Sequence, residues 1–182
     1  MGILATDEEA YKQFGDLFGP IIKDLHPKFD FRYSYKYEDL TVDLFQESLT
    51  KLHETSEKLK SFKFSARRNF KGTPFSVLMT RESKLQVERK VVEVLGELYG
   101  QYTQFNRLEE KEKVWLTSIG ASLEKQPEHD AAGINDDFPI GRGVFIHDQR
   151  QFCVLVNFED HLELIILPGG TPDHKDAIKD GL

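Results

Sequence analysis

The chain has 182 residues, of which 39% are hydrophobic and 30% charged, and its 24 Lys and Arg against 31 Asp and Glu give a formal net charge of −7. At about 150 residues per domain this length predicts one domain, and the composition excludes collagen-like, low-complexity and wholly disordered chains. The single cysteine, Cys153, excludes an internal disulfide framework and a multi-cysteine zinc site, and no apolar run approaches the ~18 residues of a membrane-spanning helix. Because residues 1–7 lack the features of a secretory signal, we expect a cytoplasmic protein with no membrane partner.

The first part of the chain predicts a helix followed by a strand. Apolar residues recur at spacings of three and four over residues 7–25, which predicts an amphipathic helix that is kinked or split at Gly19-Pro20 and ends at His26-Pro27. Over residues 29–37, rings alternate with polar residues, which predicts a strand with five aromatic side chains on one face. Such a face needs a cover. We favour a half-buried strand or an arm packed on a partner, and the alternative is a stacking or self-association surface.

Hydrophobic periodicity predicts five elements in the middle of the chain: helices at 38–60, 81–98 and 107–124, and short strands at 61–66 and 99–105. Thr80 is expected to cap the helix that follows it, because a Thr hydroxyl can accept a hydrogen bond from a free amide of the first turn. The polar stretch 125–137 is expected to be a mobile loop.

The last third of the chain differs from the rest, because it contains three successive apolar runs rich in β-branched residues: Val144–His147, Phe152–Val156 and Leu162–Leu167. The short polar segments between them predict a meander of two hairpins, which ends at Pro168-Gly169-Gly170. Cys153 lies in the second run and is expected to be an inert core thiol. Early helices and a late antiparallel sheet make the predicted fold class α+β, an antiparallel β-sheet flanked by helices, in a single domain over residues 1–182.

The polar loop Asn157–His161, together with Glu163, is the densest cluster of groups able to do chemistry. Carboxylates beside an imidazole can act as a general base or hold a cation. His161 and Glu163 are expected on one face of a strand, a geometry compatible with a metal. An acidic turn at a hairpin tip is also common without any function. We favour that interpretation, and no metal site is predicted.

A strip with six cations and no acid lies within an otherwise strongly acidic chain: Lys58, Lys60, Lys63, Arg67, Arg68 and Lys71. One such strip argues against nucleic-acid binding, which requires a dominant basic surface. Beside a glycine turn it can form an anion pocket, and Arg142, between two glycines, is a weaker candidate for the same role. The alternative is a solvated or salt-bridging strip, which residue types alone favour.

Three blocks in the same order resemble the phosphagen (guanidino) kinase family, the arginine kinases most of all. The last block contains Gly141–Phe145 and Val156–Leu162, which are similar to that family's Gly-Arg-Gly-Ile-Phe-His and Val-Asn-Glu-Glu-Asp-His-Leu-Arg. Asp7–Ile22 is similar to the family's segment between its two domains. Ser61–Phe75 is similar to its Ser-Thr-Arg-Val-Arg segment, which ends in Gly-Tyr-Pro-Phe.

The resemblance implies a fold and roles for particular residues. Residues 61–182 correspond to the first part of the family's catalytic domain, and residues 1–60 to a helical, linker-like segment that here also holds the aromatic strand. Glu159 takes the place of the carboxylate that positions and activates the guanidinium, and we expect it to be a vestigial catalytic residue. Gly2 and Ile3 stand in the place of the substrate-contacting loop, in which Leu4 replaces the family's tyrosine.

The same comparison identifies departures from the family pattern. Lys63 and Ser65 stand where the family has two arginines that clamp the nucleotide phosphates, and Glu163 stands where it has a third. Ile146 replaces the histidine that lies against adenine. A carboxylate in place of a cation beside a polyphosphate reverses the local field. The remaining candidates for anion or nucleotide binding are Lys63, Arg67, Arg68 and Arg142.

We therefore predict a shortened, catalytically inactive member of this family that acts through binding or assembly. The expected partner is a second copy of the chain or another protein that covers the sheet edge and the aromatic residues 29–37. No cofactor is expected, and ATP or ADP with Mg²⁺ is implied only if the family's activity survives. The alternatives are a small-molecule binding module with an anion or guanidino-compound pocket, a residual ATP:guanidino phosphotransferase, and a piece of a longer kinase.

Overall fold

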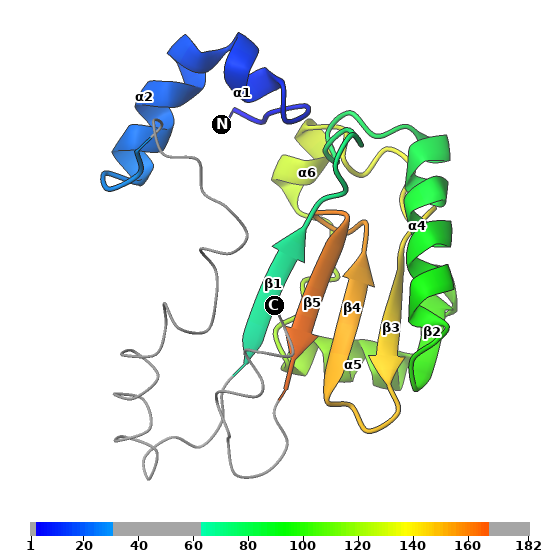
Figure 1. Cartoon of the computed structure of the whole chain (residues 1–182). Helices are drawn as coiled ribbons and strands as arrows, with labels where there is room; N and C mark the ends of the chain where they lie inside the picture. The colour runs from blue at the N-terminus through cyan, green and yellow to red at the C-terminus, as the bar shows by residue number, and fades with distance from the viewer. Residues whose placement is uncertain (1–2, 31–62, 168–182) are drawn as a thin grey trace, which may run out of the picture.

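The computed structural model of the chain describes residues 3–30 and 63–167, and five strands among them form one antiparallel sheet (Figure 1). The strands are β1 (Phe64–Arg68), β2 (Gly100–Gln104), β3 (Gly143–His147), β4 (Phe152–Val156) and β5 (Leu162–Ile166). Their spatial order is β1-β5-β4-β3-β2, and every neighbouring pair is antiparallel. The predicted meander of β3, β4 and β5 is confirmed, because short polar turns join three apolar, β-branched runs.

Helices accompany the sheet, and those in the described residues lie before β3 along the chain, interspersed with the first two strands. They are α1 (Ala10–Gln13), α2 (Gly15–Leu25), α4 (Arg81–Leu95), α5 (Glu110–Ser118) and α6 (Pro127–Ala131), with the short 3₁₀ turn η3 (Phe105–Arg107). None of the helices in the described ranges is long and apolar enough to cross a membrane.

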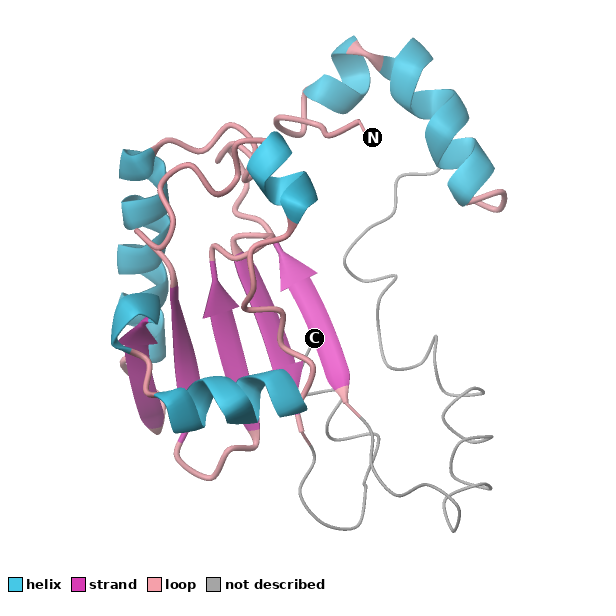
Figure 2. Cartoon of the chain, turned by 180° about the vertical axis from the view of Figure 1, so that it is seen from behind, coloured by secondary structure: helices cyan, strands magenta, loops and turns pink. Residues whose placement is uncertain are grey.

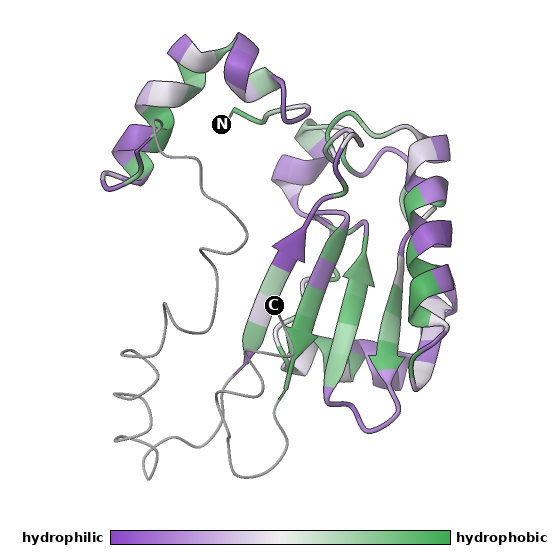
Figure 3. Ribbon diagram, in the orientation of Figure 1, coloured by the Kyte–Doolittle hydropathy of each residue, from purple (hydrophilic) through white to green (hydrophobic). Residues whose placement is uncertain are grey.

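The two faces of the sheet have separate cores, because successive side chains of a strand point to opposite faces. On one face, Val87, Val91 and Leu95 of α4 pack against Phe145, Val154 and Val156. On the other face, Leu116 of α5 packs against Val144, Cys153, Leu155 and Ile165. Figures 1 and 2 show α4 and α5 from opposite sides, and Figure 3 shows the hydrophobic residues concentrated in β3, β4 and β5. This arrangement confirms the predicted α+β fold class.

The N-terminus of α4 agrees with the sequence. The Thr80 hydroxyl accepts a hydrogen bond from the Ser83 amide at 3.3 Å, which confirms the predicted cap. The helix ends at Leu95 rather than at residue 98, and α5 covers only the middle of the predicted helix 107–124. The strand expected at 61–66 lies further along the chain, at Phe64–Arg68.

The predicted break of the first helix is at the wrong residue. Phe14 separates α1 from α2, since its φ of −112° and ψ of 36° are not helical. Pro20, at which the break was expected, lies inside α2. Pro20 is the sixth residue of α2, where its missing amide removes one hydrogen bond of the helix without ending it, because its fixed φ is compatible with a helix. Phe18 of α2 packs with Phe75, which holds this arm to the segment after β1.

Residues 125–137 are not the expected mobile loop. Pro127 opens the short helix α6, a position at which the missing amide of proline has no cost. Ile134 and Asn135 are buried. The prediction of a mobile loop from polar composition was wrong because polar side chains of this segment form hydrogen bonds inside the protein.

The expected helix 38–60 lies outside the described residues, as does most of the predicted aromatic strand 29–37. Phe29 and Asp30 are described and lie in no strand.

Helix α5 offers a matched test of the core. Leu116 is 0% exposed and Val114 is 62% exposed, although they lie on the same helix. Leu116→Ala is expected to lower the free energy of unfolding by about 2–5 kcal/mol, because it leaves a cavity in the core. Val114→Ala is expected to change it by no more than about 0.5 kcal/mol. Urea unfolding of the two variants measures both values, and similar losses would contradict the burial of Leu116.

Candidate functional site

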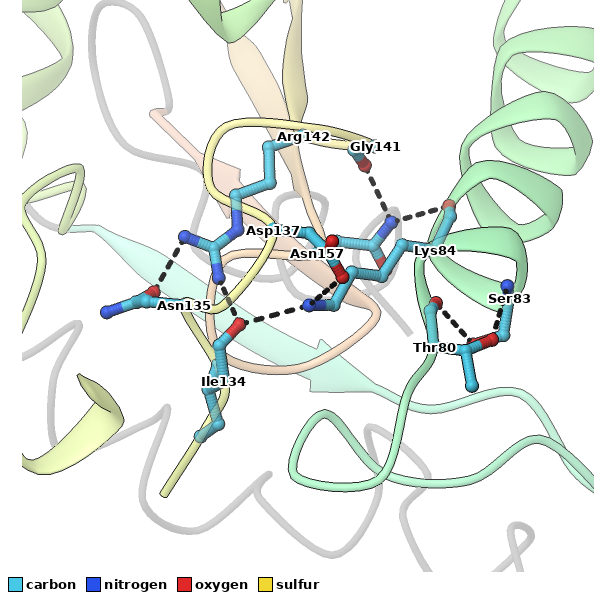
Figure 4. A network of polar contacts seen from close by, with 9 residues as sticks. All are labelled: Thr80, Ser83, Lys84, Ile134, Asn135, Asp137, Gly141, Arg142 and Asn157. Carbon is cyan, nitrogen blue, oxygen red and sulfur yellow. Dashed lines mark hydrogen bonds and ion pairs between the residues drawn. The ribbon is translucent and has the colours of Figure 1, made fainter. Parts of the chain in front are cut away.

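A buried polar network surrounds Arg142, just before β3 (Figure 4). Arg142 is 3% exposed, its Nη1 donates to Asn135 Oδ1 at 2.8 Å, and its Nη2 donates to the carbonyl oxygen of Ile134 at 3.0 Å. The guanidinium carbon also lies 4.9 Å from the centre of the Phe138 ring. Burial lowers the pKa of Arg142 to about 10, so the side chain is still charged at neutral pH. Arg142 was predicted to bind an anion, and the structure places both of its terminal nitrogens in contacts within the chain.

Lys84 of α4 enters the same network from the opposite side (Figure 4). It is 3% exposed, and its Nζ donates to the carbonyl oxygen of Ile134 at 3.2 Å and lies 3.5 Å from Asp137 Oδ2. A lysine is almost never fully buried unless it has such partners. Sequence reasoning missed Lys84, because a charged residue in an amphipathic helix gives no local sign that a distant segment covers it.

Asn157 ties the network to the turn between β4 and β5. Its φ is 58°, which asparagine tolerates better than most residues. Its side-chain amide donates to the carbonyl oxygens of Lys84 at 3.0 Å and Gly141 at 2.7 Å. Asn157 therefore joins α4, the segment before β3 and the loop that carries Glu159.

His161 holds the other end of that loop. It is fully buried, and its Nδ1 accepts a hydrogen bond from the Phe70 amide at 2.9 Å. The proton of the neutral ring is then on Nε2, which donates to the carbonyl oxygen of Pro74 at 2.9 Å. Burial lowers the pKa of His161, so the ring stays neutral. The metal geometry considered for His161 and Glu163 is wrong, because both ring nitrogens are already engaged.

An ion network lies where β1 and β5 pair. Arg67 of β1 is directly opposite Glu163 of β5, and its Nε lies 3.6 Å from Glu163 Oε1. Its Nη1 lies 2.5 Å from Glu159 Oε2. The Ser65 hydroxyl donates to Glu163 Oε1 at 2.9 Å, and His129 Nε2 lies 3.7 Å from Glu159 Oε1. Each of the two carboxylates therefore has a partner within the chain.

A small pocket adjoins this network. Its lining is Ser122, Glu124, His129, Asn135, Arg142, Phe158, Glu159 and Glu163. Of the residues predicted as a site, the structure thus brings Glu159 and Arg142 together, with Arg67 paired to the first of them. The carboxylates give the pocket a partly negative wall, while the only guanidinium in its lining has its terminal nitrogens turned to the protein.

The other predicted site residues are elsewhere. Arg68 follows Arg67 and points to the opposite face of β1, with its Nη1 donating to the backbone oxygen of Arg67 at 2.8 Å. Lys63 is exposed, and its ammonium lies against Gly120. Ile3 is 52% exposed, and Gly2 lies outside the described residues.

No group of three or more His, Cys, Asp and Glu in residues 3–30 and 63–167 is arranged to hold a metal ion. Cys153 is buried, and burial raises the pKa of its thiol to about 12, which agrees with the prediction of an inert thiol.

The fold and these residues match one class of proteins. The catalytic-domain family described as ATP:guanido phosphotransferase, C-terminal catalytic domain, matches residues 84–176. A solved structure of lombricine kinase has a TM-score of 0.78 at 22% identity, and the match covers 100% of this chain and 50% of that chain. That likeness shows the fold. The chain belongs to the ATP:guanido phosphotransferase, or phosphagen kinase, family.

Curated relatives agree with this assignment. The arginine kinase of Anthopleura japonica is 30% identical over 176 residues, which are 94% of this chain and 24% of that protein. The human M-type creatine kinase is 33% identical over 178 residues, which are 93% of this chain and 45% of that protein. The chain thus spans about a quarter to a half of the length of these relatives. The resemblance read from the sequence is confirmed.

The buried His161 makes stability depend on pH. In the unfolded chain its pKa returns to about 6.5, so below that pH the unfolded state takes up a proton that the folded state does not. The contribution to stability is complete above the unfolded pKa and is lost as the pH falls towards the lowered folded pKa. His161→Gln keeps a donor for Pro74 and removes the titration. The free energy of unfolding is expected to fall less between about pH 7.5 and 5.5 in this variant than in the wild type. Urea unfolding at both pH values tests this, and equal losses would contradict it.

Proposed function

We propose that this chain is a catalytically inactive member of the phosphagen kinase family that acts through binding or assembly. The observation that carries the proposal is the charge network of Ser65, Arg67 and Glu163. By the sequence comparison, Ser65 and Glu163 occupy two positions at which the family has arginines for the nucleotide phosphates. Here they hydrogen-bond to each other at 2.9 Å.

Electrostatics supports this proposal. Phosphoryl transfer depends almost entirely on positioning and on neutralising the phosphate charge. A carboxylate at the position of Glu163 repels a polyphosphate, and its side chain is only 13% exposed, so water screens it weakly. The residues present therefore do not fit ATP or ADP with Mg²⁺ in the family's manner.

The state of Glu159 also supports it. In the family pattern this carboxylate engages the guanidinium of the substrate. In this chain it already pairs with the Arg67 guanidinium at 2.5 Å. A substrate would have to displace a side chain that the strand pairing keeps nearby.

A small-molecule binding module is the second candidate. The pocket lined by Glu159, Glu163, His129 and Arg142 favours it. A guanidino compound suits the carboxylates of this pocket better than an anion does, since Arg142 directs its terminal nitrogens into the protein. A residual ATP:guanidino phosphotransferase is the third candidate, and only this one requires ATP or ADP with Mg²⁺.

A coupled phosphotransfer assay tests the loss of activity. The full chain is given ATP and Mg²⁺ with arginine, creatine, taurocyamine or lombricine, and only the background rate is expected, because a serine and an acid stand at two of the family's phosphate-binding positions. The matched control is Glu159→Gln, which should give the same rate. Turnover in the wild type that this substitution abolishes would overturn the proposal.

Assembly is tested separately. We propose a homodimer or a protein partner that covers the edge strand β1 and the aromatic residues 29–37. In the described residues β1 lies at one edge of the sheet, and unpaired edges attract further strands. Several large apolar side chains of the N-terminal arm are exposed, including Tyr11, Phe14, Leu17 and Leu25. Light scattering of the purified chain at micromolar concentration is expected to give twice the monomer mass, and a clean monomer would count against the homodimer.

A cytoplasmic location remains a prediction.

A further inference from the structure

The guanidinium of Arg67 lies between two carboxylates that come from different parts of the chain. Its Nη1 is 2.5 Å from Glu159 Oε2, in the turn after β4, and its Nε is 3.6 Å from Glu163 Oε1, in β5. Two nitrogens of one planar group thus face two acids, as a bound guanidino compound would.

Contacts other than those with Arg67 hold the backbone of Glu159 and the carboxylate of Glu163. The Ser76 hydroxyl donates to the backbone oxygen of Glu159 at 2.5 Å, and the Ser65 hydroxyl donates to Glu163 Oε1 at 2.9 Å. Asn157 and His161 anchor both ends of the turn that carries Glu159. Removal of the Arg67 side chain should therefore leave both acids close to their present places.

Both carboxylates also line the pocket described above, and Arg67 is not part of that lining. The side chains of Arg67 and Glu159 are 45% and 41% exposed, so the ion pair is open to solvent and a competitor can reach it. The side chain of Glu163 is 13% exposed, so its carboxylate would be a poorly solvated, unpaired charge if Arg67 were removed.

We propose that Arg67 is a built-in occupant of the Glu159 and Glu163 carboxylates and excludes external guanidino compounds from them. This inference deepens the proposed function and rests on it, since it explains how the two carboxylates that line the pocket are paired from within the chain. Arg67 acts as an autoinhibitory contact, and whatever withdraws its side chain opens the site.

Isothermal titration calorimetry with methylguanidinium chloride tests the proposal on the full chain. Arg67→Ala is expected to bind the probe at least about tenfold more tightly than the wild type, since the probe can then donate charge-assisted hydrogen bonds to the carboxylates that Arg67 leaves unpaired. The matched control is Arg68→Ala, which removes the same group from the neighbouring position of β1 and should bind like the wild type. Arg67→Ala with Glu159→Gln should lose the gain.

Arg67→Gln is the second variant, because it keeps the first methylene groups and a polar, uncharged end if Arg67→Ala does not fold, and it should show the same gain. Methylammonium chloride separates guanidinium recognition from simple charge. Binding by Arg67→Ala and Arg67→Gln no tighter than by the wild type would overturn the proposal, as would an equal gain in Arg68→Ala or an equal gain for methylammonium.

The outcome is independent of the phosphotransfer assay. Turnover by the wild type would overturn the proposed function whatever the binding result. Unchanged binding in the Arg67 variants, with background turnover in the wild type, would overturn only the occupancy of the site by Arg67.

Discussion

The turn between β4 and β5 is fixed at both ends by buried side chains, and the site depends on this constraint. Asn157 begins the turn at a φ of 58° and donates to the carbonyl oxygens of Lys84 and Gly141. His161 ends it, with one ring nitrogen bonded to Phe70 and the other to Pro74. The backbone N–H of Asn157 also donates to the backbone oxygen of His161 at 3.0 Å, which closes the turn. A loop anchored in this way presents Glu159 from a fixed place on the sheet.

The charges around that turn balance in an unequal way. Arg67 and Glu159 are both substantially exposed, so their ion pair adds little to stability by itself. Glu163 is much less exposed, and the cation opposite it in the sheet offsets the cost of removing its carboxylate from water. The strand pairing therefore places Arg67 directly beside Glu163, and from the same position Arg67 also reaches Glu159.

The sequence predicted what local patterns encode. The β3–β5 meander followed from β-branched runs, and the start of α4 followed from Thr80. It failed where the answer depends on distant residues. The burial of Lys84 is caused by a segment that includes Ile134, 50 residues away along the chain. Polar composition at 125–137 indicated a loop, whereas the side-chain amide of Asn135 forms hydrogen bonds inside the protein, with Asp130 and Arg142.

The candidate site shows the same limit. Glu159 was identified from a motif, because the residues around it in the chain resemble those of a family. Its pairing with Arg67 was not, because that contact requires the register between β1 and β5, which joins residues far apart in the chain. The strip that contains Arg67 was recognised as basic, but residue types alone did not indicate which of its cations would meet an acid.

The departures from the family pattern are physically connected under the proposed function. Arginines gathered for phosphates repel one another when no phosphate is present, so a chain that no longer binds nucleotide gains stability by losing them. Ser65 and Glu163 stand at two of those positions and hydrogen-bond to each other across the paired strands. Once an acid replaces the arginine at position 163, a neighbouring cation is needed, and Arg67 in the opposing strand supplies it. The guanidinium that pairs with Glu163 also reaches Glu159. Under the proposed function, the loss of the phosphate site and the occupation of the Glu159 carboxylate by Arg67 follow from one electrostatic change rather than two.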